Sequence, residues 1–241
     1  MEIHRPKVIR NWHEFWIEIG TIVFSILIAL GLEQLVTQWH EQAAAHEALK
    51  SIKQEVADDF ARFDRRAGLQ SCIDTRLDQV EALLQAAETP GYVAPTWIGR
   101  PPWWEADSNR WQAAVQAGRV SLFGQEDQAV LSAVYEDFRG VNDQEDAEQR
   151  DWAQLRALER DPHPSSALLA QLRLALQDAR VQNWAIRVSL GQDREIAAPL
   201  HLPRSQDVFS FQPASRSACL PLTTSRADGV RLSGGGRWGE P

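Results

Sequence analysis

The longest stretch of this chain without a charged residue lies near its N-terminus. Residues 19–32 read IGTIVFSILIALGL, and apolar flanks extend the stretch to Phe15 and Val36. The uncharged core alone would span about 21 Å as a helix, whereas the extended stretch matches the roughly 30 Å hydrocarbon core of a bilayer. Apolar side chains cover every face, which favours a helix surrounded by lipid. The pattern predicts a transmembrane helix over residues 15–37.

Tryptophans bracket the predicted span. Trp12 and Trp16 lie at one end and Trp39 lies at the other, as tryptophan does at the two membrane–water interfaces. Two alternatives stay open at this point. A cleavable signal peptide would use the small residues of Ala29-Leu30-Gly31, and a core helix of a soluble protein would bury the same apolar run.

Basic residues set the expected orientation. Three of them precede the span, the last being Arg10, whereas the nearest one after it is Lys50. The positive-inside rule therefore places residues 1–14 in the cytoplasm. The rest of the chain would lie in the periplasm, attached to a bacterial inner membrane.

Small residues form a stripe on one face of the span. Thr21, Ser25 and Ala29 follow one another at intervals of four, and Glu33 continues the series. Such a stripe lets two membrane helices approach closely, so it makes a homo-oligomer a candidate. The competing interpretation is that small residues are common in membrane helices generally.

Apolar residues recur at three- and four-residue spacing beyond the span, which is typical of amphipathic helices. The pattern predicts an all-α domain over residues 38–199, a bundle of about five to six helices. The first continues out of the membrane to about Phe63, and the others cover about 69–87, 107–118, 126–138, 142–160 and 165–191. Trp184 is expected on the inner side of the last helix, and the acidic cluster Glu145, Asp146 and Glu148 on a solvated face.

Prolines and a triple glycine mark residues 200–241 as a mostly disordered tail. Only Val208–Phe211 and Cys219–Leu222 are expected to dock on the domain. Cys72 and Cys219 are the two cysteines of the chain. They would be free thiols in the cytosol, whereas a disulfide between them becomes plausible outside it.

An aromatic, proline-rich segment separates the second and third predicted helices. It carries Tyr92, Trp97, Trp103 and Trp104 among four prolines and two glycines, so it cannot be a helix. One interpretation is a binding loop, because rigid aromatic side chains offer much contact area. The other, which we favour, is a strap whose tryptophans are buried over the ends of the helices.

Composition limits the chemistry. The chain has 33 acidic and 25 basic residues and a formal charge of −8, which argues against nucleic acid as a partner. The six histidines and two cysteines show no metal-ligand spacing, and no nucleophile, phosphate-loop or dinucleotide motif is present. We expect no cofactor, no metal and no enzymatic activity.

Short motifs along the chain carry a resemblance to a known family. They are WHEF at 12–15, the end of the apolar run at 27–36, Trp39-His40, Cys72 with Arg76-Leu77, IGRPP at 98–102, Trp152 with Leu155, and CLPL at 219–222. Together they resemble a broad family of uncharacterised bacterial single-pass inner-membrane proteins. The resemblance implies an N-terminal membrane helix and a helical extracytoplasmic domain, and it brings no catalytic residue with it.

These features predict a membrane-anchored helical interaction domain. Its partners would be the lipid bilayer and either an unknown protein or a second copy of the chain. The alternative is an extracytoplasmic sensor of small ligands that uses the Trp-rich loop 92–104 as part of a pocket. Burial of those tryptophans would favour the interaction domain, and a pocket lined by them would favour the sensor.

Overall fold

The computed structural model describes residues 12–206 and 217–232, and every regular element in these two ranges is helical, which confirms the all-α prediction. The basic residues that precede the span and Val208–Phe211 lie outside the described residues. In chain order the elements are α1 (Trp12–Ala67), α2 (Gln70–Ala86), α3 (Asn109–Gln116), η1 (Arg119–Leu122), α4 (Gln125–Leu155), η2 (Arg156–Glu159), α5 (Ser166–Ala197), η3 (Ala198–Leu200) and α6 (Arg226–Leu232).

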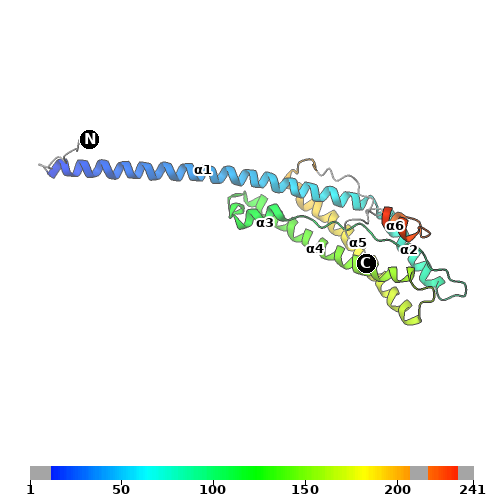
Figure 1. Cartoon of the computed structure of the whole chain (residues 1–241). Coiled ribbons are helices and arrows are strands. Elements are labelled where there is room, and N and C mark those ends of the chain that lie inside the picture. Colours follow the sequence, from blue (N-terminus) through cyan, green and yellow to red (C-terminus); the bar gives the residue numbers. More distant parts are fainter. Residues whose placement is uncertain (1–11, 207–216, 233–241) are drawn as a thin grey trace.

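Helix α1 runs without a break from the predicted span into the domain. It has 56 residues, which makes it about 84 Å long at 1.5 Å per residue. Its N-terminal half projects from the molecule, and its C-terminal half lies along the other helices (Figure 1). It ends at Ala67, where Gly68 donates a hydrogen bond to the carbonyl of Asp64 and the chain turns into α2. One rigid element therefore joins the apolar segment to the folded domain.

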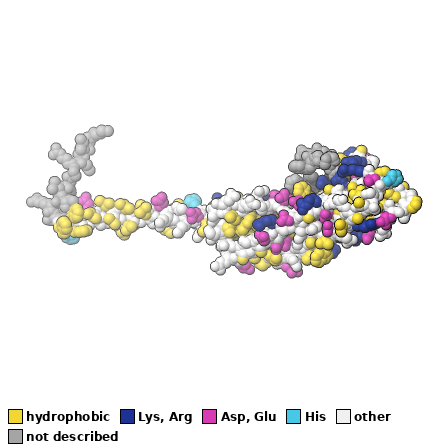
Figure 2. Space-filling model, turned by 90° about the horizontal axis from the view of Figure 1, so that it is seen from below, with side chains coloured by type: hydrophobic (Ala, Val, Ile, Leu, Met, Phe, Trp, Pro, Cys, Tyr) yellow, Lys and Arg dark blue, Asp and Glu magenta, His cyan; other side chains and the backbone are white. Residues whose placement is uncertain are grey.

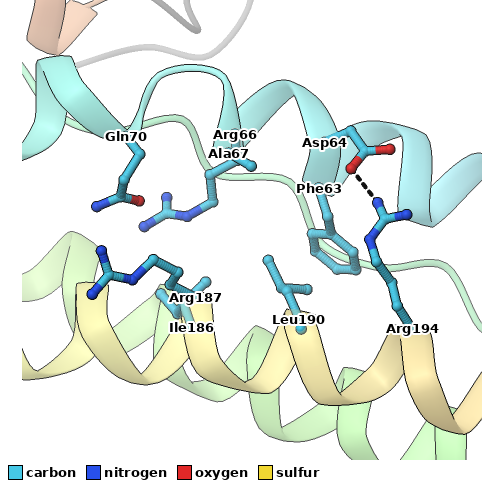
Figure 3. Close-up of a pocket in the computed structure, with 10 residues that line it drawn as sticks. Phe63, Asp64, Arg66, Ala67, Gln70, Ile186, Arg187, Leu190 and Arg194 are labelled. Carbon is cyan, nitrogen blue, oxygen red and sulfur yellow. Dashed lines mark hydrogen bonds and ion pairs between the residues drawn. The ribbon is translucent and has the colours of Figure 1, made fainter.

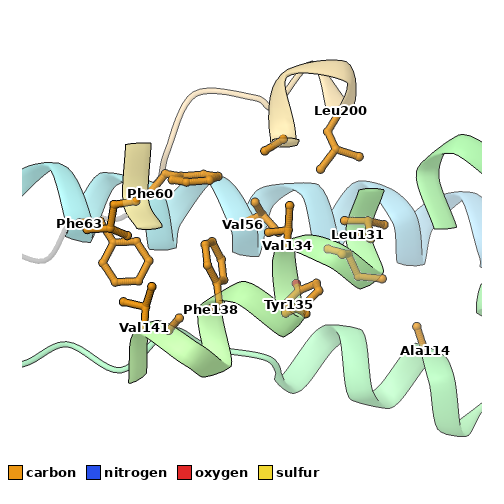
Figure 4. Packing of buried hydrophobic residues seen from close by; sticks show 14 of the residues in the cluster. Val56, Phe60, Phe63, Ala114, Leu131, Val134, Tyr135, Phe138, Val141 and Leu200 are labelled. Carbon is orange, nitrogen blue, oxygen red and sulfur yellow. The ribbon is translucent and has the colours of Figure 1, made fainter. Parts of the chain in front are cut away.

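The domain is built on α4 and α5, which pack against each other along much of their length. Residues 161–164, a proline-rich break, join them through η2. The first core cluster lies between α1, α4 and the end of α5. Its centre is Phe138, whose ring meets those of Phe60 and Phe63 edge-on at centroid distances of 5.3 and 5.4 Å (Figure 4). Burying each such ring stabilises the fold by about 1.5–3 kcal/mol.

A second core cluster lies farther from the projecting half of α1. Trp152 and Leu155 of α4 are fully buried there, against Ile73 and Leu77 of α2 and Leu172 of α5. The inward positions of α2 follow the predicted apolar stripe. Two cores in succession give the domain its elongated shape (Figure 1).

Three features differ from the prediction. Helix α4 is continuous across Gly140, where two helices were expected, because a single exposed helical glycine costs only about 1 kcal/mol and the buried face on both sides of it is retained. Trp184 is 57% exposed and points away from the core. The tail contains α6 and a 3-10 turn at 217–219, both regular elements that its composition did not indicate.

The packing of α6 against Trp97 requires a glycine at position 229, where there is no room for a side chain. A Cβ placed on Gly229 would lie 2.3 Å from the ring of Trp97, which is itself buried. We predict that Gly229→Ala lowers the free energy of unfolding by about 1–3 kcal/mol through overpacking. Gly140→Ala is the matched control, because a Cβ there meets nothing within 4 Å and should stabilise α4 by up to about 1 kcal/mol. Denaturant unfolding of both variants tests this. Equal stability of the two would contradict the packing described for α6.

Candidate functional site

The apolar half of α1 is bare. Every side chain from Trp16 to Ala43 is exposed, and one 18-residue window of this helix is apolar enough to cross a membrane while none of it is buried. Figure 2 shows this stretch as a narrow, largely hydrophobic rod that projects from the domain. A soluble core helix would be covered by the rest of the chain, so the exposure argues against that alternative.

The predicted interface tryptophans are exposed at the two ends of this segment. Trp12, Trp16 and Trp39 are 75%, 56% and 73% exposed. Along the segment, the Thr21 hydroxyl donates to the carbonyl of Ile17 at 2.8 Å and the Ser25 hydroxyl to that of Thr21 at 2.7 Å. Because both hydroxyls already donate a hydrogen bond within the helix, placing them in lipid costs less free energy than placing unpaired hydroxyls there.

The small-residue stripe is not covered by any other element in the described part of the chain. Thr21, Ser25 and Ala29 are all exposed. A Cβ placed on Gly20 or Gly31 would meet nothing within 4 Å. The face is thus open to a second helix, and the homo-oligomer stays a prediction.

The Trp-rich segment 92–104 crosses the domain as a strap. Trp97 is 1% exposed and its indole N–H donates to the carbonyl of Ser217 at 3.0 Å. Trp104 is partly buried under the guanidinium of Arg65, 5.5 Å from its ring centroid, whereas Trp103 is 49% exposed. Tyr92 is half-buried, and none of the four lines either of the two cavities described below. The arrangement favours the strap over the binding loop.

A buried arginine of α2 ties this strap to the C-terminal segment. Arg76 is 3% exposed and donates to the carbonyls of Trp97, Ile98 and Leu220. Burial lowers its pKa to about 10, opposed by the charge of Glu159. The guanidinium therefore satisfies three carbonyls that belong to no helix or sheet.

Cys72 and Cys219 are joined by a disulfide in the same region, with Cα atoms 5.1 Å apart. Close approach of the backbones makes this junction possible. Gly99 has a φ of 72°, and a Cβ on it would lie 2.4 Å from the carbonyl oxygen of Ser217. The bridge closes a loop with a sequence separation of 147, which stabilises the fold by about 5 kcal/mol in the chain-entropy account.

The strap is held on its other side by two buried acids, which corrects the expectation for these members of the acidic cluster, whereas Asp146 is exposed as expected. Glu145 and Glu148 are both 0% exposed, not solvated. Glu148 pairs with buried Arg66 at 2.6 Å, and Glu145 accepts the backbone N–H of Trp104 at 3.0 Å. Arg66 also donates to the carbonyl of Pro102 at 2.9 Å. These charges serve as hydrogen-bond partners for a backbone that has no secondary structure of its own.

The same pattern continues toward α3. Asp59 accepts the N–H of Asp107 at 3.2 Å, and Glu55 accepts the N–H groups of Arg110 and Trp111 at 2.9 and 3.4 Å. Glu55 of α1 thus caps the first turn of α3 from a distance in sequence of more than fifty residues. Ser108 occupies the N-cap position of α3 without a side-chain cap bond.

Burial shifts the pKa values of several of these acids upward. Desolvation raises the pKa of Asp59 to about 8 against the opposing effects of the Asp107 N–H and Arg62. It raises the pKa of Glu145 to about 8 against the charge of Arg66. The pKa of Asp193 in α5 rises to about 7 through burial and the neighbouring charge of Asp137. Glu145 and Asp59 use these carboxylates to accept backbone N–H groups of Trp104 and Asp107.

Two shallow cavities lie between α1 and α5. The first has Phe63, Ile186 and Leu190 as an apolar floor, with Arg187 and Arg194 at the edge; Arg194 pairs with Asp64 (Figure 3). Its volume is about 200 Å³, below the 300–1,000 Å³ of a usual ligand pocket. The second, bounded by α1, the end of α5 and the segment after it, has a volume of about 340 Å³, at the lower end of that range. Among the described residues, no group of three or more His, Cys, Asp and Glu side chains is placed to hold a metal.

Comparison of the chain with protein-family models, with curated proteins and with solved structures gives no match. The resemblance to bacterial single-pass membrane proteins therefore stays a prediction, as does the absence of enzymatic activity.

The buried acids make stability depend on pH. Because the folded chain holds a proton on Glu145 more tightly than the unfolded chain, the contribution of Glu145 to the free energy of unfolding should be greatest below about pH 4.5 and be lost as the pH rises toward about 8. The slope is at most about 1.4 kcal/mol per pH unit for each proton released. The denaturant midpoint of unfolding, measured between about pH 4.5 and about pH 8, tests this prediction. Glu145→Gln should flatten the slope, whereas Glu136→Gln, at a side chain 69% exposed, should not; an unchanged slope in Glu145→Gln would refute this assignment.

Proposed function

We propose that this chain is a single-pass membrane protein of a bacterial inner membrane, with its N-terminus in the cytoplasm and its helical domain outside. There the domain binds a protein partner or a second copy of itself. The observation that carries the proposal is the continuity of α1, because its uncovered apolar half and its packed half are one helix. A signal peptide would be removed at a cleavage site, whereas here the helix continues without a break through residues 29–31 into the core.

The disulfide supports the extracytoplasmic side. Cys72 and Cys219 lie in the domain, far from the span, and such bonds form and persist in oxidising compartments. The basic residues that precede the span point to the same orientation.

An uncovered apolar row on α5 supports an interaction role. Leu174, Val181 and Trp184 are 68%, 57% and 57% exposed, and they lie on one side of the helix. Exposed tryptophan flanked by aliphatic residues is typical of the centre of protein–protein interfaces. The ligand-sensor alternative has less support, because the strap tryptophans line neither described cavity.

The orientation is tested by a reporter fused after residue 241, using one reporter that works only in the periplasm and one that works only in the cytoplasm. We expect activity from the periplasmic reporter alone. In the same cells, alkylation without a reductant should leave Cys72 and Cys219 unmodified, and alkylation after reduction should modify both. Cytoplasmic reporter activity with two free thiols would overturn the proposed placement.

A further inference from the structure

One corner of the domain lies close to the level at which α1 would leave a membrane. This corner, the α3–η1 tip, comprises residues 109–122 and forms the end of the domain nearest the projecting half of α1 (Figure 1). Because α1 is continuous, it fixes the height of the tip above any bilayer that the apolar half crosses.

The height follows from the helix rise. Ala45 is the first buried residue along α1 and belongs to the same core cluster as Ala114 and Phe123 of the tip region. It lies six residues beyond Trp39, which corresponds to about 9 Å. The headgroup layer on each side of a bilayer is about 5–8 Å thick. With Trp39 at the edge of the hydrocarbon, Ala45 lies just beyond the headgroup layer, which is within reach of side chains at the tip.

The tip is held firmly at this height. Glu55 accepts the N–H groups that open α3, and the Arg110 guanidinium donates to the carbonyl of Ser51 at 2.9 Å. Trp111 stacks on Tyr135 at 5.2 Å, and the Tyr135 hydroxyl donates to Glu55 at 2.7 Å. The tip cannot move along α1 without breaking these contacts.

The surface chemistry of the tip suits a phospholipid headgroup layer. Residues 108–125 contain no acidic residue, although the chain has 33 of them in 241. The basic residues in this stretch are Arg110 and Arg119, and Arg119 is exposed. Val115 and Leu122 are 50% and 48% exposed beside it. Apolar side chains next to arginine, without carboxylates that phosphate would repel, are what an interfacial contact requires.

We propose that the α3–η1 tip rests on the outer surface of the same bilayer, with Val115 and Leu122 entering the headgroup region and Arg119 facing a lipid phosphate. This proposal rests on the membrane anchoring proposed above. A second contact beside the span fixes the tilt of the domain. It also fixes the direction in which the apolar row of α5 is presented to a partner.

The test measures depth at three positions. The full chain is placed in vesicles of phosphatidylethanolamine and phosphatidylglycerol, with one spin label at a time from Leu122→Cys, Ile26→Cys or Val93→Cys. Ile26 lies in the span, and Val93, 80% exposed, lies on the loop after α2 at the opposite end of the domain (Figure 1). Collision with oxygen is compared with collision with a water-soluble nickel chelate.

We expect the oxygen-to-nickel ratio at Leu122 to exceed that at Val93 several-fold and to lie below that at Ile26. If the label at Ile26 lies inside the bilayer while the label at Leu122 is as accessible to nickel as the label at Val93, the tip contact is overturned and the anchor is retained. Nickel access at Ile26 would overturn the anchor itself. Shielding of Leu122 that rises with the protein-to-lipid ratio would mean contact with a second copy, and would overturn the lipid assignment.

A charge reversal tests the role of Arg119. In the Leu122-labelled chain, Arg119→Glu should raise nickel access at Leu122 several-fold, and Arg119→Lys should retain most of the shielding. Circular dichroism is the folding control, and both variants should be folded, since Arg119 is exposed and lies outside the core. Unchanged depth in Arg119→Glu would overturn the assignment of Arg119 to a phosphate.

Discussion

The architecture depends on one helix that meets two different environments. The N-terminal half of α1 exposes apolar side chains on all faces, and the C-terminal half buries one face against α4 and α5. Neither half has a proline, and the backbone hydrogen bonds run unbroken from one to the other. A flexible linker would let the domain move freely about its anchor. A continuous helix instead holds the domain at a fixed position relative to the anchor. The positions of the disulfide, the α5 row and the α3–η1 tip relative to a bilayer therefore follow from α1.

The domain has charged side chains in its interior because the backbone of the strap needs hydrogen-bond partners. The strap's backbone groups pair with no neighbouring strand or helix, so buried side chains of other elements have to satisfy many of them. Arg66 of α1, Arg76 of α2 and Glu145 of α4 do this from inside the protein, where each would be costly without a partner. The pKa shifts toward neutral pH result from this structural use. In the part of the chain that the structure describes, His, Cys, Asp and Glu side chains form no group of three or more that is placed to hold a metal.

The sequence predicts elements that local pattern determines. The span follows from an uncharged run, α2 from an apolar stripe ended by Thr89-Pro90-Gly91, and the break before α5 from two prolines. Interactions between distant residues were not predictable in this way. Glu148 meets Arg66 at a separation of 82 residues, and nothing around Glu148 distinguishes it from an acid on a solvated face. The place of α6 depends likewise on Trp97, which is far from it in sequence.

The central claim is that the apolar half of α1 and the domain form one rigid unit in a membrane. It is tested most directly by the distance between spin labels at Ile26→Cys and Lys50→Cys, in full-length protein in lipid nanodiscs, with the two native cysteines bonded. A continuous helix predicts a single narrow distribution near 36 Å, from 24 residues at about 1.5 Å each. A broad distribution, or one centred at a much shorter distance, would show a hinge between anchor and domain and would contradict the account.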